Sequence, residues 1–339
     1  MTDIRAVVLA AGKGTRMNSE EPKCAHYIID KTMIEYVIDS LNGAKITDII
    51  TVVGYKREVI QSILKDRCRY VVQDEQLGTA HAVLMAEPLL KDKEGITLIA
   101  IGDMPFVSKT TYSNLIAAHI QENADLTILT TEHPNPYGYG RIIRNENDEI
   151  LEIVEEKDCT KAQRSIQEIN ASVYAVDNKK LFAAIKEIKS NNNQKEYYLT
   201  DIVKIFKEKG YKVFGYKASD YKEISGINDK IQLAEMEEEL RKKIVRKHLL
   251  NGVTIHHPDT VTIGVDVKIA SGAIIRENTL IVYNSVIGKN CKIGPFTEIK
   301  NSTIGDGASI KCSYIKNSTI DKNAKIGPFV FINNNVKEQ

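Results

Sequence analysis

The chain has 339 residues, of which 42% are hydrophobic and 27% charged, a length that predicts two or three folded domains. Its 46 Lys and Arg balance 45 Asp and Glu, so the net charge of +1 excludes a global field that would recruit nucleic acid or an anionic membrane. No apolar run approaches the roughly 18 residues that span a bilayer, and the five cysteines lack CxxC spacing. We therefore expect a cytoplasmic protein with reduced thiols, no nucleic-acid partner and no membrane insertion.

Short apolar runs alternate with helical patterns over the first 228 residues. Runs that predict strands are Ala6–Ala11, Ile49–Val53, Tyr70–Gln73, Ile96–Ile101 and Leu126–Thr130. Segments that predict helices are Met33–Leu41, Val59–Leu64, Ala80–Leu90 and Thr110–Ile120. The alternation predicts an α/β fold with a doubly wound, mostly parallel, Rossmann-like sheet that binds ligands at the carboxyl ends of its strands.

The loop after the first predicted strand combines glycines with cations. It reads Leu9-Ala10-Ala11-Gly12-Lys13-Gly14-Thr15-Arg16-Met17, and Lys23 follows within reach. Glycines let backbone N–H groups approach an anion, and the cations add charge-assisted contacts to phosphate. The loop is neither a Walker A motif nor a dinucleotide GxGxxG motif. The loop is compatible with two interpretations, a binding site for a triphosphate and a purely structural turn.

A second loop, Gly102-Asp103-Met104-Pro105, follows the predicted strand Ile96–Ile101. An aspartate at the carboxyl end of a buried strand is well situated to hold a divalent metal ion. An Asx turn is the alternative interpretation of the same residue.

One long amphipathic helix is predicted between about Asp229 and Leu250, where Gly and Pro are absent. Its apolar stripe comprises Leu233, Met236, Leu240, Ile244 and Val245. For its other faces we expect solvent exposure of Glu235, Glu237, Glu238, Arg241, Lys242 and Lys247. The predicted organisation is thus a domain at 1–228, a linker helix at 229–250 and a third part at 251–339.

The third part carries a hexapeptide period. Isoleucines recur at steps of six, later five or six, at Ile263, Ile269, Ile275, Ile281, Ile287, Ile293, Ile299, Ile304, Ile310, Ile315, Ile320, Ile326 and Ile332. A step of six matches neither a helix nor a single strand, and indicates short strands joined by tight turns. This pattern resembles the left-handed parallel β-helix, in which three hexapeptides form one coil, and implies about four coils.

Several ordered motifs together resemble a known enzyme family. The first loop, Glu21-Pro22-Lys23, Gln76–Ala82 and Gly102-Asp103 resemble sugar-1-phosphate nucleotidyltransferases. The later segments Tyr137–Ile142, Ile153–Asp158, Ile166–Asn170, Glu196–Asp201 and Gly226–Asp229 narrow the resemblance to the bacterial bifunctional N-acetylglucosamine-1-phosphate uridyltransferases. The helix and the β-helix follow in that family's order.

The resemblance implies that UTP and N-acetylglucosamine 1-phosphate yield UDP-N-acetylglucosamine and pyrophosphate, with Mg²⁺ as cofactor. It implies that the nucleotide is bound by Leu9, Ala10, Ala11, Gly12, Gln73, Gly78 and Thr79. Catalytic roles fall to Arg16, Lys23 and Asp103, and the expected metal ligands are Asp103 and Asn228. The expected sugar-binding residues are Gly140, Glu155, Asn170 and Asn228.

Three positions depart from the family pattern. Ala171-Ser172 stands where Thr-Gly is usual, Lys195 replaces a usual glycine, and Ile101 stands where some members carry Tyr. The Ala171-Ser172 pair leaves open a second function, which is transfer to another sugar 1-phosphate. A third possible function is that of a non-catalytic nucleotide-sugar-binding regulatory protein. The family's acetyltransferase site lies in later coils of a longer β-helix, so for this chain we expect no acetyltransferase activity, and we expect the coils to form a homotrimer.

Overall fold

The computed structural model describes residues 3–338, and the side chains of residues 3–335. The chain divides into two compact units. Unit 1 combines the chain up to His26 with Thr32–Asp229, and unit 2 combines Tyr27–Lys31 with the chain from Lys230 onward. The three-part division made from the sequence stays a prediction. No helix among residues 3–338 is both long and apolar enough to cross a membrane.

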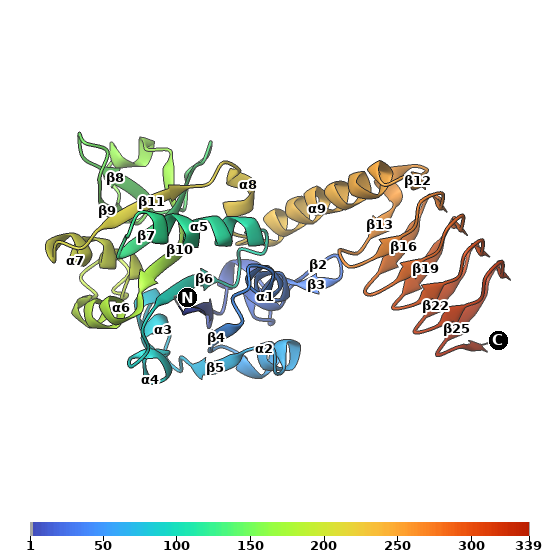
Figure 1. The fold of residues 1–339 in the computed structure, drawn as a ribbon, viewed down its shortest axis with the longest axis horizontal. Helices are drawn as coiled ribbons and strands as arrows, with labels where there is room; N and C mark the ends of the chain where they lie inside the picture. The colour runs from blue at the N-terminus through green and yellow to red at the C-terminus, as the bar shows by residue number, and fades with distance from the viewer. Residues whose placement is uncertain (1–2, 339) are drawn as a thin grey trace. The chain divides into compact units, whose positions relative to one another are not determined.

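A mixed sheet forms the centre of unit 1, with strand order β11-β7-β10-β6-β1-β4-β5 (Figure 1). These strands are β1 (Ile4–Ala10), β4 (Asp48–Val53), β5 (Arg69–Val72), β6 (Ile96–Ile101), β7 (Leu126–Glu132), β10 (Glu168–Asp177) and β11 (Val213–Lys217). β1 pairs in parallel with β4 and β6, as predicted, whereas β10 runs antiparallel between β6 and β7. A hairpin of β8 (Arg141–Arg144) and β9 (Ile150–Val154) joins the sheet through β10.

Helices cover both faces of this sheet. Alternate residues of β1 point to opposite faces, and each set is buried in a separate hydrophobic core. Ala6 and Val8 belong to one hydrophobic core, which also contains residues of α1 (Met33–Gly43), α2 (Arg57–Leu64) and α5 (Lys109–Gln121). The opposite core contains Val7. Its helices are α3 (Thr79–Leu84), α4 (Glu87–Leu90), α6 (Asn178–Ala184) and α7 (Ile202–Glu208), while α8 (Tyr221–Ile224) follows β11.

The single helix predicted at Ala80–Leu90 is wrong, because the segment forms two helices, α3 and α4. Pro88 supplies the reason: it has no N–H to donate to the carbonyl four residues earlier, and its ring disfavours a continuous helix. The first part of the segment, α3, is therefore a separate short helix.

Unit 2 begins with α9 (Lys230–Leu250), which buries Ile244 and Val245 as predicted. The expectation of a solvated Arg241 is wrong, since this residue is 8% exposed. Its Nη1 donates to the carbonyls of Pro258 and Val261 at 2.6 and 3.0 Å, and its guanidinium also pairs with Glu238. These two carbonyls lie 17 and 20 residues further along the chain, which a helical pattern cannot reveal.

The remainder of unit 2 is the expected left-handed parallel β-helix, built from three stacks of short strands (Figure 1). Its strands are β12 (Thr254–Ile255), β13 (Thr262–Ile263), β14 (Lys268–Ile269), β15 (Ile274–Ile275), β16 (Thr279–Val282), β17 (Val286–Ile287), β18 (Lys292–Ile293), β19 (Thr297–Lys300), β20 (Thr303–Ile304), β21 (Ser309–Ile310), β22 (Tyr314–Lys316), β23 (Thr319–Ile320), β24 (Lys325–Ile326) and β25 (Phe331–Asn333), with β26 (Val336–Glu338) antiparallel to β25. Isoleucine pairs with isoleucine from coil to coil, as Ile263 with Ile281 and Ile281 with Ile299. All thirteen predicted isoleucines lie in strands, and the fold begins one strand earlier, at Ile255.

A hairpin of β2 (Tyr27–Ile28) and β3 (Lys31–Thr32) brings Asp30 into unit 2. The Asp30 carboxylate is 6% exposed and accepts hydrogen bonds from the backbone N–H groups of Tyr283 at 2.7 Å and Val265 at 3.5 Å. Lys31 pairs with Asp266 at 2.6 Å. The β-helix unit therefore incorporates a segment that lies about 200 residues earlier in the chain.

Candidate active site

A cavity of about 340 Å³ opens in unit 1 where β1, β5 and β6 end. All seven residues predicted to bind the nucleotide line it, namely Leu9, Ala10, Ala11, Gly12, Gln73, Gly78 and Thr79. Lys23 and Asp103, two of the predicted catalytic residues, line the same cavity. The residues singled out in separate loops thus surround one space.

The glycine-rich loop bends sharply after β1 and enters a 3₁₀ turn at Thr15–Met17. Gly14 has φ of 68°, and a Cβ there would lie 2.5 Å from the Cβ of Lys23. Glycine is therefore required for the loop to approach the lysine. Lys13, by contrast, lies over the ring of Tyr55 at 5.3 Å, so its ammonium is engaged in a cation–π contact.

Four side chains from three parts of the sequence meet beside this glycine-rich loop. The Lys23 ammonium contacts both the Asp103 carboxylate and the Oδ1 of Asn228, the latter at 2.8 Å. Arg16 donates to the same Asn228 oxygen at 2.7 Å. The site therefore contains two cations and two oxygen-bearing side chains in direct contact.

The second oxygen of Asp103 is suited to bind a cation. This Oδ1 atom is buried and has no hydrogen-bond partner among residues 3–338. The oxygens of Asp103 and Asn228 already converge on one positive group, the Lys23 ammonium. A carboxylate and an amide oxygen are hard donors, so the pair fits a divalent ion that keeps waters and phosphate oxygens as further ligands. Within the described residues, no cluster of three His, Cys, Asp or Glu forms a metal site.

The end of the cavity next to α3 is built on Gly78 and Gln73. Gly78 has φ of 124°, and a Cβ there would lie 2.5 Å from the carbonyl oxygen of Tyr197. Thr79 Oγ1 accepts a hydrogen bond from the N–H of Leu199 at 2.9 Å. Gln73 is 3% exposed, and its Nε2 donates to the Gly78 carbonyl at 3.1 Å. This loop is therefore rigidly held against residues 197–199.

Three of the four predicted sugar-binding residues lie together, and the fourth, Asn228, contacts Arg16 and Lys23. Asn170 N–H donates to the Gly140 carbonyl at 2.9 Å, and a Cβ on Gly140 would lie 3.5 Å from Glu155 Oε2. Glu155 accepts from Thr200 Oγ1 at 3.1 Å, and burial raises the pKa of its carboxyl group. Glu155 and Arg16 line a second cavity, of about 550 Å³. Arg16 thus belongs both to the four-residue cluster and to the cavity lined by Glu155.

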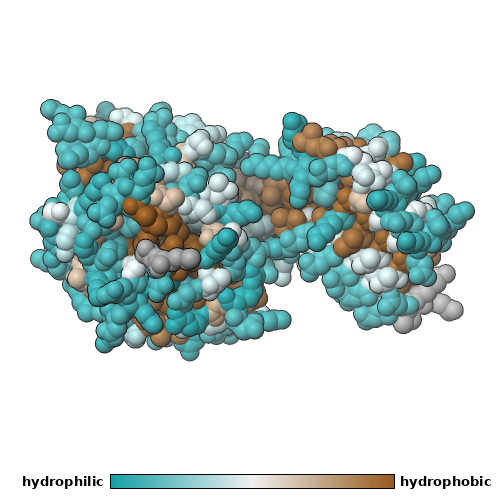
Figure 2. Space-filling view, in the orientation of Figure 1, coloured by the Kyte–Doolittle hydropathy of each residue, from teal (hydrophilic) through white to brown (hydrophobic). Residues whose placement is uncertain are grey.

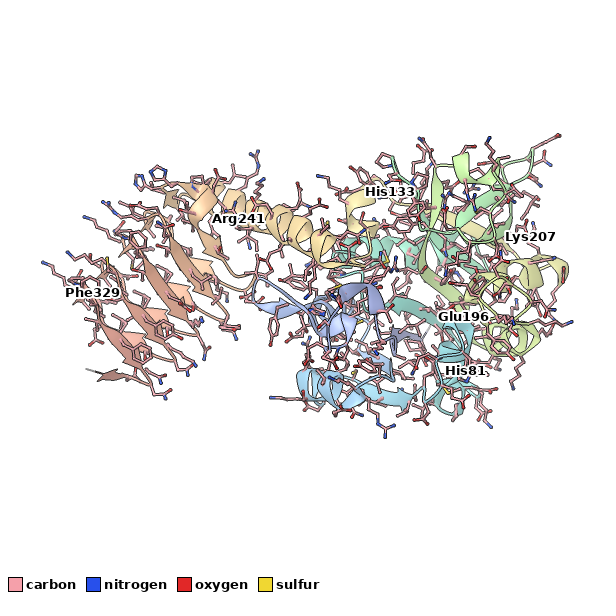
Figure 3. The ribbon with its side chains drawn as sticks, turned by 180° about the vertical axis from the view of Figure 1, so that it is seen from behind. His81, His133, Glu196, Lys207, Arg241 and Phe329 are labelled. Carbon is pink, nitrogen blue, oxygen red and sulfur yellow. The ribbon has the colours of Figure 1, made fainter. Side chains whose placement is uncertain are left out.

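The first cavity is also lined by residues that were not predicted as site residues, among them Glu196 and Ser172. Glu196 opens the segment Glu196–Asp201, so the family motif was a signal that could have identified it. His81 lies with its Nδ1 atom 3.0 Å from Gln73 Nε2. Figure 3 labels His81 and Glu196 in the same region of unit 1.

Comparison with known proteins assigns the family. Residues 5–230 match the nucleotidyl transferase family model, and residues 259–337 match the model of the GMPPB C-terminal domain. The chain is 44% identical over 313 residues to the bifunctional protein GlmU of Brevibacillus brevis, covering 92% of this chain and 68% of the relative. It belongs to the GlmU family.

Other relatives give the same result. Identity is 44% over 308 residues to GlmU of a Geobacillus species, covering 91% of this chain and 67% of the relative. Identity is 42% over 311 residues to GlmU of Streptococcus agalactiae, covering 92% and 68%. The chain is a sugar-1-phosphate nucleotidyltransferase that spans about two thirds of the length of these GlmU proteins.

Proposed function

We propose that this GlmU-family protein transfers the uridylyl group of UTP to N-acetylglucosamine 1-phosphate, giving UDP-N-acetylglucosamine and pyrophosphate, with Mg²⁺ as the metal. The observation that carries the proposal is the contact of Arg16, Lys23, Asp103 and Asn228 beside the cavity that all seven candidate nucleotide residues line.

The reaction is an in-line displacement at the α-phosphorus. A phosphate oxygen of the sugar phosphate forms the new bond, and the bond to the bridging oxygen of pyrophosphate breaks. Because such a transfer needs little covalent work from the protein, positioning and charge neutralisation supply most of the catalysis. Arg16 neutralises the β- and γ-phosphates, and Lys23 stabilises the charge at the reacting centre.

Asp103 and Asn228 are the side chains that would hold Mg²⁺. The metal ion, when bound, neutralises phosphate charge and orients the phosphate oxygens. The buried, unpartnered Oδ1 of Asp103 supports this assignment. Lys23 contacts both side chains and would remain beside the phosphates as a second positive charge.

Substrate recognition is divided between the two ends of the site. Gln73, Gly78 and Thr79 read the uracil, while Leu9–Gly12 follow the nucleotide. Gly140, Glu155 and Asn170 hold the sugar and its N-acetyl group, with Asn228 close to its phosphate. The charged form of Glu155 accepts hydrogen bonds only, which suits sugar hydroxyl donors.

The deciding experiment measures pyrophosphate release from UTP and N-acetylglucosamine 1-phosphate, with and without Mg²⁺. Faster turnover of glucose 1-phosphate or N-acetylgalactosamine 1-phosphate would replace the proposed acceptor. Calorimetric binding of UTP by folded protein that releases no pyrophosphate would favour the regulatory alternative. Asp103→Ala should abolish turnover without changing the thermal melting of the protein, and retained turnover would remove Asp103 from the metal site.

We further propose a homotrimer formed through the β-helix. Support comes from the large hydrophobic side chains exposed on unit 2, with Phe296 and Phe329 exposed by 66% and 90%. Figure 2 shows hydrophobic atoms on the coils of this unit. Light scattering measures the oligomer, and a monomer at micromolar concentration would contradict the proposal. The lack of acetyltransferase activity stays a prediction, measured by acetylation of glucosamine 1-phosphate with acetyl-CoA.

A further inference from the structure

The side-chain amide of Gln73 has one orientation fixed by its surroundings. Its Nε2 lies 3.1 Å from the backbone carbonyl oxygen of Gly78 and 3.0 Å from Nδ1 of His81. A backbone carbonyl can only accept a hydrogen bond, so the atom facing it must be the amide nitrogen. The nitrogen has a second N–H, and His81 Nδ1 can receive it only as an acceptor. The His81 ring therefore carries its proton on Nε2.

This arrangement leaves the other amide atom of Gln73 as an acceptor. Oε1 accepts no hydrogen bond from any other group within residues 3–338, although the residue is 3% exposed and lines the cavity. Uracil presents an N–H donor at N3, whereas cytosine presents a bare acceptor nitrogen at the same position. An acceptor fixed at this point pairs with uracil and repels cytosine. Base selection thus depends on what prevents the amide from rotating.

We propose that His81 is a positioning residue that fixes the Gln73 amide and so sets the preference for uracil over cytosine. The inference rests on the proposed function, in which Gln73 reads the base. In the native protein, a flipped amide would turn Oε1 toward the Gly78 carbonyl and would require the His81 proton to move from Nε2 to Nδ1. Without His81 only the first cost remains, and Nε2 would gain a cytosine N3 acceptor. A single carbonyl contact remains to oppose that flip.

The position of His81 is itself well determined. It lies in α3, and that helix is tied to the segment after Glu196 by a hydrogen bond from Ala80 N–H to the Tyr197 carbonyl at 2.9 Å. The imidazole lines a cavity of about 250 Å³. The other residues lining it are Leu77, Ala80, Leu84, Ile185, Lys186, Ile188 and Tyr197. Mainly apolar neighbours offer few competing partners for Nδ1, so the Gln73 contact is its main polar interaction.

Two substitutions separate the acceptor from the shape of the side chain. In His81→Asn, the amide oxygen branches from Cγ as Nδ1 does in histidine, so an acceptor is kept at nearly the same point. In His81→Leu, a side chain of similar reach has no acceptor. The readout is kcat/KM for UTP and for CTP with N-acetylglucosamine 1-phosphate, together with binding of UTP and CTP by calorimetry.

We expect His81→Leu to lower the UTP-to-CTP ratio by about tenfold, the effect of one misdirected hydrogen bond, mainly through KM for UTP. His81→Asn should keep the ratio within about twofold of the native protein, because a twofold change is well below the effect of a lost hydrogen bond. An unchanged ratio in His81→Leu, or an equal loss in both variants, would overturn the inference. If His81→Leu does not fold, His81→Met replaces it, with the same expected loss of the UTP-to-CTP ratio and the same results that would overturn the inference.

The native protein provides the separate test of the underlying function. A native enzyme that uses CTP as well as UTP would refute base reading by Gln73, whatever the variants do. A native enzyme that selects UTP, with a ratio insensitive to His81, would refute only the role of His81.

Discussion

Glycine at position 172 should give a more stable unit 1 than alanine at the same position. Ser172 lies in β10, at the point where the pairing of β10 with β7 shifts register between Asn170 and Tyr174. Its φ is 54°, a left-handed conformation that brings the Cβ of an L-residue close to the following carbonyl. The sequence pattern of the family usually has glycine here. Ser172→Gly removes the crowded atom, and Ser172→Ala is the control that keeps it.

The size of the effect follows from two opposing contributions. The left-handed conformation costs an L-residue about 1–2 kcal/mol. Glycine loses about 0.5–1 kcal/mol more conformational freedom on folding than alanine. The free energy of unfolding of Ser172→Gly should therefore exceed that of Ser172→Ala by about 0.5–1 kcal/mol. Both variants lose the hydroxyl that hydrogen-bonds Tyr174, so that loss cancels in the comparison.

Urea unfolding followed by circular dichroism measures the difference, and thermal melting should show roughly 2–4 °C per kcal/mol. Lys195, with φ of 56° and an exposed side chain, provides an independent second position for the same pair of substitutions. Alanine variants as stable as the glycine variants at both positions would refute the reasoning, because they would show that the Cβ is accommodated without cost.

Three further predictions concern other contacts. Arg241→Leu removes two hydrogen bonds from a guanidinium to backbone carbonyls and should lower the free energy of unfolding of unit 2 by about 2–4 kcal/mol, with a smaller loss for Arg241→Lys in urea titrations. Gly78→Ala forces a Cβ to within 2.5 Å of the Tyr197 carbonyl and should cost about 1–3 kcal/mol in melting experiments and weaken UTP binding. Burial raises the pKa of Glu155, so its carboxylate is protonated at a higher pH than an ordinary glutamate as the pH falls. As the pH is lowered, activity should therefore begin to fall at a higher pH than an unperturbed glutamate would give. Glu155→Gln should be less active, and its activity should not show this fall at acid pH.

The strands and repeats that were predicted correctly share one property, which is a run or a regular period of buried apolar residues. β6 coincides with the predicted run Ile96–Ile101, because nearly every residue of this central parallel strand is buried. The isoleucine period predicts the β-helix for a related reason. Each coil needs one inward apolar residue per side, and Ile281 and Ile299 stack directly on each other.

Strand β10 was not predicted, and it combines buried apolar and polar residues in one segment. β10 buries Asn170 at a bulge, so its ten residues show no regular alternation. The burial of Arg241 and Asp30 follows from backbone groups that lie elsewhere in the chain, at residues 258–261 and 265–283. A local pattern has no access to such partners, and a charged residue is then assigned to the surface by default.

The candidate site shows the same distinction. Arg16, Lys23 and Asp103 could be proposed from their own loops, because cations after a glycine turn and a carboxylate after a buried strand are local features. Their contact with Asn228 joins residues up to 212 positions apart and depends on the whole sheet. The family resemblance supplied this link, since the segment Gly226–Asp229 has no local feature that marks it.

The two lost glycines indicate how the site tolerates departures from its family pattern. Asn170 Oδ1 accepts a hydrogen bond from the Ser172 N–H at 2.9 Å, and Asn192 Oδ1 accepts one from the Glu196 N–H at 3.2 Å. In both turns an asparagine side chain holds the backbone next to the left-handed residue, which offsets part of its conformational cost. The turn at the proposed sugar site is therefore held by Asn170 and does not depend on glycine at position 172. We accordingly expect the acceptor preference to be the same in the native protein and in Ser172→Gly, and to change in Asn170→Ala, as measured by kcat/KM for N-acetylglucosamine and glucose 1-phosphates. A change of preference in Ser172→Gly would show that the serine side chain, and not the asparagine, shapes the N-acetyl site.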